Sequence, residues 1–172
     1  NFNGTDTFTY KANDGTADSN VATVTITVCS LNGAPPAAAH SDTPVLGICY
    51  GGQLMSHALG GSVERAHRTE IGWYDVSSED PELAPPGPWF EYHVDKFTPP
   101  PEAEVFASTA AGPQAYRLGS MLALQFHPEV SPEIVRRWGA EGIADAEPSD
   151  VDLEAVYRRS DERADDARAR CT

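Results

Sequence analysis

The chain has 172 residues, which is enough for one domain of ordinary size or two small ones, and 40% of the residues are hydrophobic. Its formal net charge of −14 argues against a nucleic-acid-binding protein, which would show a basic patch, and against binding to an anionic membrane surface. No apolar run reaches about 18 residues, so the sequence predicts no membrane-spanning helix.

The chain has three cysteines, Cys29, Cys49 and Cys171. Their odd number and wide spacing are not typical of a disulfide framework. No Cys-x-x-Cys or His-x-x-x-His pair occurs, so we expect no structural zinc site, no other metal and no cofactor.

Residues 1–28 carry the pattern of a β-hairpin. Aromatic residues alternate with polar ones before the Asp14-Gly15 pair, and threonine alternates with aliphatic residues after it, which is typical of two strands around a tight turn. The stretch NGTDTFTYKANDGTADSNVATVTITV resembles the final strands of the cadherin-like repeats of bacterial surface adhesins. The resemblance implies that residues 1–29 are a fragment of such a repeat, which on its own would indicate an extracellular protein.

Residues 30–43 are predicted to be a linker, because Pro, Ala, Gly and Ser dominate them without periodicity. From Pro44 the pattern becomes that of an α/β domain, which we expect to span 44–172. The strands predicted in this domain occupy 45–48, 62–67, 70–76, the end of 81–94, 103–109, 114–119 and 122–127.

Three helices are predicted in the same region. The first begins near Gln53 and ends at Gly60-Gly61, and the second opens with an N-cap and a proline at Ser131-Pro132 and runs to about Trp138. The third covers 150–170. Its apolar stripe is thin and it carries i,i+4 charge pairs, so we expect a mostly solvated surface helix (the pairs are Glu154/Arg158 and Asp166/Arg170).

The stretch PVLGICYGGQL places Cys49 between a short buried strand and a glycine-containing turn that opens a helix. This is the arrangement of a nucleophile elbow. The helix N-terminus is expected to favour the thiolate, and the Tyr50 N–H lies where a donor to an oxyanion belongs. Taken alone, Cys49 could equally be a buried, inert cysteine at a strand end.

The stretch LQFHPEV supplies a possible base for this cysteine. His127 leaves the carboxyl end of a predicted strand, Pro128 prevents the strand from continuing, and Glu129 lies two residues further on. A carboxylate at that position would accept from one imidazole nitrogen, so that the other could take the proton of Cys49. The alternative is a surface His-Pro-Glu turn.

Together, GICYGGQLMSHALGG and LALQFHPEV resemble the class I glutamine amidotransferase domain, in its GMP-synthase-like branch, and EIGW, YHVDKF and AYRLG follow in that family's order. The resemblance covers roughly Pro44 to Trp138. It implies a partial, flavodoxin-like three-layer α/β sandwich. A complete family domain begins well before the nucleophile strand, so we expect an N-terminally incomplete domain with weak activity or none.

The resemblance also implies the chemistry. Cys49 would attack the side-chain amide of L-glutamine to form a thioester and release ammonia, His127 would transfer the proton, and Glu129 would orient His127. The substrate-binding residues would be Tyr50, Gln53, His93 and Asp95, although His93 could instead be an ordinary loop histidine. The ammonia-accepting synthetase would be a separate chain, and the protein would be cytoplasmic.

Two other functions fit the sequence. Residues 1–28 and the acidic composition fit an adhesion or structural module without catalysis. The same cysteine, histidine and glutamate also fit a related cysteine peptidase or a γ-glutamyl hydrolase.

Overall fold

A computed structural model describes residues 4–11, 16–28, 44–141 and 151–170. The predicted Asp14-Gly15 turn, Cys29, the predicted linker over 30–43, and Cys171 lie outside these ranges. The chain divides into two compact units, Asn1–Pro35 and Pro36–Thr172.

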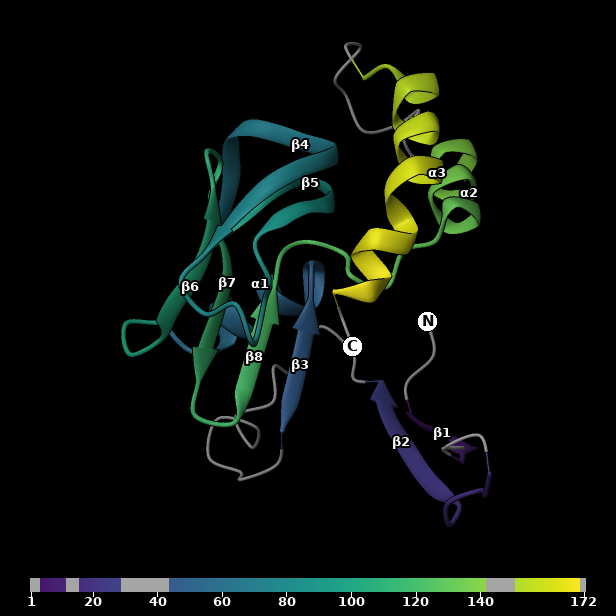
Figure 1. The fold of residues 1–172 in the computed structure, drawn as a ribbon. Coiled ribbons are helices and arrows are strands. Elements are labelled where there is room, and N and C mark those ends of the chain that lie inside the picture. Colours follow the sequence, from purple (N-terminus) through teal and green to yellow (C-terminus); the bar gives the residue numbers. More distant parts are fainter. Residues whose placement is uncertain (1–3, 12–15, 29–43, 142–150, 171–172) are drawn as a thin grey trace. The chain divides into compact units, whose positions relative to one another are not determined.

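The first unit contains a two-stranded antiparallel sheet. Strands β1 (Gly4–Tyr10) and β2 (Ala22–Val28) pair along their whole length, with Gly4 opposite Val28 and Tyr10 opposite Ala22 (Figure 1). The predicted hairpin strands are therefore confirmed.

The second unit is built on a six-stranded mixed sheet in the order β3-β8-β7-β6-β4-β5 (Figure 1). Among the described strands only β3 and β8 are parallel, and the other neighbours are antiparallel. The strands are β3 (Val45–Ile48), β4 (Ser62–Ser78), β5 (Gly87–Thr98), β6 (Glu104–Thr109), β7 (Gly112–Leu118) and β8 (Met121–Leu124). The mixed sheet and the three helices of the second unit together confirm the predicted α/β class.

Three of the predicted strands differ clearly from those observed. The segments 62–67 and 70–76 were expected to be separate, but β4 is one long strand whose pairing with β5 is irregular between Arg65 and Glu70. The two strands form a hairpin that curls over the sheet (Figure 1). The predicted strand over 122–127 ends early, at Leu124, because the chain turns there and the His127 amide donates to the Phe90 carbonyl of β5 at 2.8 Å.

Helix α1 (Tyr50–Ala58) follows β3 directly, and helices α2 (Pro132–Glu141) and α3 (Leu153–Ala169) lie side by side (Figure 1). The predicted N-cap of α2 is confirmed, since the Ser131 hydroxyl accepts from the Ile134 amide at 3.3 Å. Asp152 caps α3 in the same way, accepting from the Ala155 amide at 3.0 Å.

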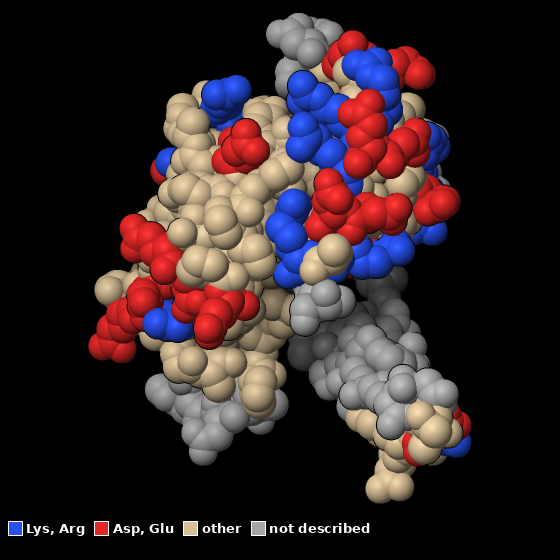
Figure 2. All heavy atoms as spheres, viewed as in Figure 1, with Lys and Arg blue, Asp and Glu red and all other residues tan. Residues whose placement is uncertain are grey.

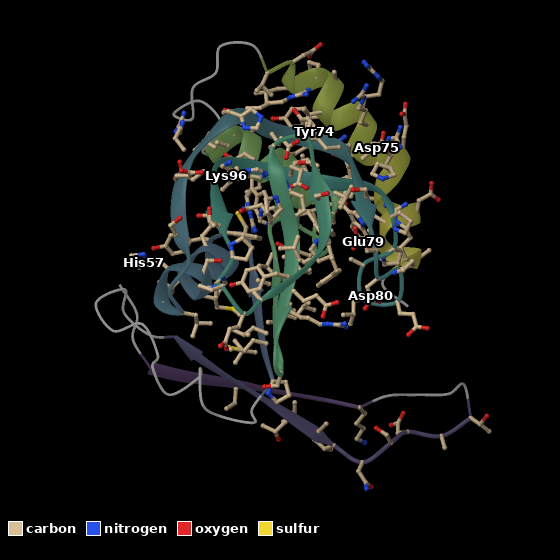
Figure 3. All side chains as sticks on the ribbon, turned by 90° about the vertical axis from the view of Figure 1, so that its left-hand side faces the viewer. His57, Tyr74, Asp75, Glu79, Asp80 and Lys96 are labelled. Atoms are coloured by element: carbon tan, nitrogen blue, oxygen red, sulfur yellow. The ribbon has the colours of Figure 1, made fainter. Side chains whose placement is uncertain are left out.

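Helix α3 is less solvated than its sequence indicated. It buries Val156, Ser160, Ala164 and Ala167, and the Trp73 indole of β4 donates to the Ser160 hydroxyl at 2.9 Å. In Figure 3, Tyr74 and Asp75 lie on β4, and Glu79 and Asp80 follow the end of this strand at Ser78. The charges of α2 and α3 cover their outer surface with both signs interspersed (Figure 2). The two predicted i,i+4 pairs are not among the ion pairs formed by the described residues.

The main hydrophobic core lies between the curled sheet and helices α2 and α3. Its large members are aromatic, and the stacked rings of Trp89 and Phe126 are 4.9 Å apart. A smaller cluster of Phe97, Tyr116 and Ala123 packs against Met55 of α1. In the described part of the chain, no helix combines the length and the apolar composition needed to cross a membrane.

Candidate active site

Cys49 stands at a sharp turn between β3 and α1. Its φ of 50° and ψ of −109° make it the one non-glycine residue with positive φ among those described. Such a conformation costs about 1–3 kcal/mol and persists only where the surroundings hold it. Here the Cys49 amide donates to the Leu124 carbonyl at 2.7 Å, and the Cys49 carbonyl accepts from the Gln53 amide at 3.0 Å. The predicted nucleophile elbow is therefore present as backbone geometry.

Gly47 makes the close approach of strand and helix possible. A Cβ atom at this position would lie 2.4 Å from the Met55 sulfur and 2.8 Å from backbone atoms of Gly51 and Gly52. Real Cβ contacts are not this short, so any side chain here would push α1 away from β3. The helix N-terminus stays beside Cys49 because Gly47 has no side chain.

The structure brings His127 and Glu129 together as predicted. The His127 Nδ1 and Glu129 Oε1 atoms are 2.7 Å apart, and the imidazole packs edge-on against the Trp138 ring at 4.8 Å. The other ring nitrogen, Nε2, is buried and has no hydrogen-bond partner among the described residues. Burial raises the pKa of Glu129, but the hydrogen bond to His127, the imidazole's charge and a backbone amide together lower it below its usual value. The carboxylate is thus ionised beside the ring.

The sulfur of Cys49 makes two contacts. Its thiol donates to the Tyr92 carbonyl at 3.8 Å, and the Gln125 Nε2 donates to the sulfur at 3.6 Å. No hydrogen bond joins Cys49 to His127 in the part of the chain that the structure describes.

The thiol is not activated in the way that the sequence predicted. Burial, together with the charges of Glu91 and Glu129, raises the pKa of Cys49 to about 11, against the opposing effect of the Tyr50 amide and the Gln125 side chain. The helix N-terminus therefore acts in the predicted direction, but burial outweighs it. A thiol of this kind needs a general base.

A cavity of about 220 Å³ opens at Cys49. It is smaller than the roughly 300–1,000 Å³ typical of pockets for drug-sized ligands, so its volume suits a small metabolite. The lining includes all four residues predicted to bind substrate, and its members are Cys49, Tyr50, Gln53, Ile71, Tyr92, His93, Val94 and Asp95.

His93 also belongs to a buried charge cluster. Its Nε2 lies 3.3 Å from a carboxylate oxygen of Glu70 and 3.3 Å from one of Glu91, and its Nδ1 lies 3.0 Å from the Asp95 carbonyl oxygen. Burial lowers the pKa of His93, but hydrogen bonds and charges from the two glutamates raise it to about 9. Burial raises the pKa of Glu91 to about 7. The imidazole is therefore positively charged between the two carboxyl groups.

Glu70, Glu91 and His93 could also bind a cation, because their potential metal-ligand atoms lie within 4.8 Å of one another. The sequence did not predict this possible site. However, the Glu70 oxygen nearest His93 already accepts from Thr109 at 2.9 Å and from Gln114 at 3.0 Å. Together with the protonated imidazole, these donors fill the position that a metal would take. We assign the cluster to internal charge compensation.

Sequence reasoning missed Gln125, Glu70 and Glu91. Gln125 is fully buried and touches the Cys49 sulfur, and both glutamates are fully buried beside the cavity. The available signal was a polar or acidic residue within an apolar run, in LALQF, EIGW and WFEY. Gln125 is met by Gln53 of α1 and by Cys49, and Glu70 accepts from Thr109 of β6 and Gln114 of β7. Glu91 faces His93 of its own strand.

Comparison with known proteins gives a consistent family assignment. Residues 28–137 match the family described as "Glutamine amidotransferase class-I". The chain is 38% identical over 112 residues to a GMP synthase (glutamine-hydrolysing) of Cereibacter sphaeroides, covering 56% of this chain and 21% of that protein. It is 43% identical over 97 residues to the enzyme of the same name from Lactobacillus acidophilus, covering 51% and 19%. The chain thus spans about a fifth of these curated relatives.

Solved structures agree with this assignment. A glutamine amidotransferase from Thermotoga maritima superposes with a TM-score of 0.68 at 27% identity, over 76% of this chain and 60% of that one. The enzyme from Methylobacillus flagellatus superposes with a TM-score of 0.69 at 28% identity, over 81% and 63%. The fold of the second unit is therefore that of part of these larger domains.

Proposed function

The chain belongs to the class I glutamine amidotransferase family, and from this premise we propose that it hydrolyses the side-chain amide of L-glutamine to glutamate and ammonia. The observation that carries the proposal is the backbone of Cys49. A cysteine held at positive φ, at the mouth of a small cavity and at the N-terminus of a helix, has the geometry of a nucleophile rather than of a buried structural thiol.

In this proposal Cys49, His127 and Glu129 form the catalytic triad. The thiol proton passes to His127 Nε2, which has no hydrogen-bond partner in the described part of the chain, while Glu129 holds Nδ1. The sulfur attacks the amide carbon, and the Tyr50 amide donates to the oxygen that becomes negative. His127 then protonates the departing nitrogen, and ammonia leaves a thioester. Water, deprotonated by His127, cleaves the thioester and releases glutamate.

The substrate would lie between the helix N-terminus and the wall formed by β5. Tyr50, Gln53, His93 and Asp95 line this space with Cys49, and we propose them as the substrate-binding residues. In the relatives named as GMP synthases, glutamine hydrolysis is part of a longer protein. For this chain we propose that a separate synthetase accepts the ammonia.

We also propose a domain organisation for the chain. Residues 1–29 are a fragment of an adhesin-like repeat and residues 30–43 are a linker. Residues 44–172 are an incomplete amidotransferase domain of weak activity. The family match begins at residue 28, where β2 ends, which supports a boundary near this point. A chain of residues 44–172 should then hydrolyse glutamine as fast as the whole chain.

The test of the main proposal is ammonia release from L-glutamine by the purified chain and by Cys49→Ala, with Cys49→Ser as a second variant of similar size. We expect slow release that depends on Cys49. Release that is the same in all three proteins would overturn the proposal. Cleavage of γ-glutamyl peptides without any release of ammonia from glutamine would favour a γ-glutamyl hydrolase instead.

A further inference from the structure

Gln125 occupies an unusual position for a polar side chain. It follows β8 directly and is fully buried, and its backbone amide donates to the Gln114 carbonyl of β7 at 2.7 Å. Its carboxamide lies between the side chains of Gln53 and Cys49. Burying an amide is costly unless each end has a partner, so the two contacts explain why the residue is tolerated there.

The hydrogen bonds fix which end of this carboxamide faces the sulfur. The Asp95 carbonyl can only accept, so the Gln53 Nε2 group that lies 3.0 Å from it must be the donor. The same Nε2 group lies 3.3 Å from the side-chain oxygen of Gln125, which accepts its second hydrogen. The Gln125 Nε2 group is then left to face Cys49 at 3.6 Å. The orientation follows from a backbone carbonyl, which cannot flip.

A second donor holds the Asp95 carbonyl in place. His93 Nδ1 lies 3.0 Å from the same oxygen, and the His93 ring is clamped on its other side by Glu70 and Glu91. A continuous path of polar contacts therefore runs from the buried charge cluster, through Asp95 and Gln53, to Gln125 and the sulfur.

The sulfur needs such a donor because burial, the nearby charges and the Tyr92 carbonyl oppose its ionisation. The charged groups that act on it are Glu91 of β5 and Glu129 beyond β8, and both are acidic. Tyr92 offers it only a carbonyl oxygen, which can accept from a thiol but repels a thiolate. The favourable contributions come from the Tyr50 amide at the start of α1 and from Gln125. In the reaction above, the Tyr50 amide turns to the substrate oxygen, so the side chain of Gln125 is the donor that remains with the sulfur.

We propose that Gln125 is a further catalytic residue, whose carboxamide N–H stabilises the thiolate of Cys49 and whose orientation is set by Gln53 and the Asp95 carbonyl. Its role in turnover rests on the proposed function, in which Cys49 is the nucleophile. Its effect on the sulfur does not, because any reaction of the thiolate reports it.

The experiment is the rate of alkylation of Cys49 by iodoacetamide between about pH 7 and pH 10, followed by mass spectrometry of the peptide that contains Cys49. Gln125→Met removes the donor and keeps the length of the side chain. A charge-assisted hydrogen bond to the thiolate lowers the pKa of the thiol by about one unit or more, so losing it should lower the thiolate fraction about tenfold. The thiolate that remains is more basic and about threefold more nucleophilic, which offsets part of this loss. We expect alkylation at a fixed pH near 8 to slow by about threefold or more. Gln125→Glu, which keeps the size and adds a negative charge, should slow it further.

Gln114→Met is the matched control. It also removes a buried glutamine from the neighbouring strand, but Gln114 contacts Glu70 and Thr109 rather than Cys49. Its alkylation rate should stay within about twofold of the wild-type rate, with circular dichroism confirming that all variants are folded. Equal slowing in Gln114→Met and Gln125→Met would mean general loosening of the core, and it would overturn the proposal, as would an unchanged rate in Gln125→Met.

Glutamine hydrolysis measured on the same variants separates this inference from the proposed function. Loss of hydrolysis in Gln125→Met with an unchanged alkylation rate would contradict the role in stabilising the thiolate. If the wild-type chain releases no ammonia but Gln125→Met still slows alkylation, the proposed function fails and the assignment of Gln125 to the sulfur stands.

Discussion

At the scale of single residues, Cys49 is held in a strained conformation while its surroundings keep the thiol protonated. The pKa of about 11 comes mainly from burial. Free of substrate, such a thiol is protected from indiscriminate reaction, since the thiolate is the reactive form. In the proposed mechanism, His127 and its partner Glu129 therefore have to activate the thiol by removing its proton.

If these residues act as one unit, their substitutions should not be additive. We expect His127→Ala to lower glutamine turnover on the order of 10³-fold, because general acid–base catalysis typically contributes 10²–10⁴-fold. Glu129→Gln keeps a hydrogen-bonding side chain of the same size but loses the charge, so it should cost about tenfold. The double variant should be no slower than His127→Ala alone. Steady-state kinetics of the three proteins decide this, and additive losses would show that Glu129 acts elsewhere.

His93 provides a prediction for stability as a function of pH. Its pKa is raised from 6.5 to about 9 in the folded chain, so the stabilisation it provides is complete below pH 6.5 and is lost as the pH rises to about 9. The difference corresponds to at most about 3 kcal/mol. Urea denaturation at several pH values should show unfolding free energy falling over this range. His93→Gln should flatten the fall, and an unchanged slope in this variant would mean that the charge cluster is not the cause.

At the scale of helices and strands, small residues of α3 make contacts that a search for apolar periodicity does not reveal. Ser160 accepts from the buried Trp73 indole and donates to the Val156 carbonyl. Ala164 and Ala167 let the helix lie close to the rest of the second unit. The charges of α3 predicted its exposed face correctly, but they gave no sign of this buried one.

Ser160→Ala should therefore destabilise the second unit although it changes one atom. The Trp73 N–H would be left buried without a partner, which costs about 1–3 kcal/mol. Glu162→Ala, an exposed change on the same helix, should alter the unfolding free energy by no more than about 0.5 kcal/mol. Equal effects in the two variants, measured by chemical denaturation, would show that α3 does not pack on β4 as described.

The sequence could predict those elements and contacts that have a local signal. Strand β3, helix α1 and the pairing of His127 with Glu129 each have a local signal, namely an apolar run, a glycine turn and a proline after a histidine. The single long strand β4 and the early end of β8 depend on pairing with β5, which no local pattern encodes. Gln125, Glu70 and Glu91 were missed because nothing in the sequence around them shows that these polar side chains are buried.

At the scale of the whole molecule, β3 lies at the end of the sheet. Among the described strands nothing pairs with its outer edge, and Leu46 on it is 57% exposed. An edge strand presents a row of unpaired backbone N–H and C=O groups, with which a further strand can pair. The solved relatives that superpose on the chain are longer, since this chain covers 60% and 63% of them.

We therefore expect that replacing residues 1–43 with the complete N-terminal segment of such a relative will stabilise the second unit and raise glutamine turnover. A donor to the oxyanion contributed by that segment would account for on the order of 10²–10³ in rate. Thermal unfolding and ammonia release by the chimera and the native chain measure both effects. Turnover by the native chain equal to that of the chimera would show that β3 needs no further strand.

The most direct test of the central claim is to treat the chain with a glutamine analogue that carries an electrophile in place of the side-chain amide, and to map the labelled residue by mass spectrometry. Such a probe reacts only where a nucleophile meets the carbon that glutamine would present. The account predicts that Cys49 is labelled, that Cys29 and Cys171 are spared, that excess L-glutamine protects Cys49, and that His127→Ala slows the labelling. Labelling of all three cysteines at one rate, without protection by glutamine, would contradict the assignment of Cys49 as the nucleophile of an amidotransferase site.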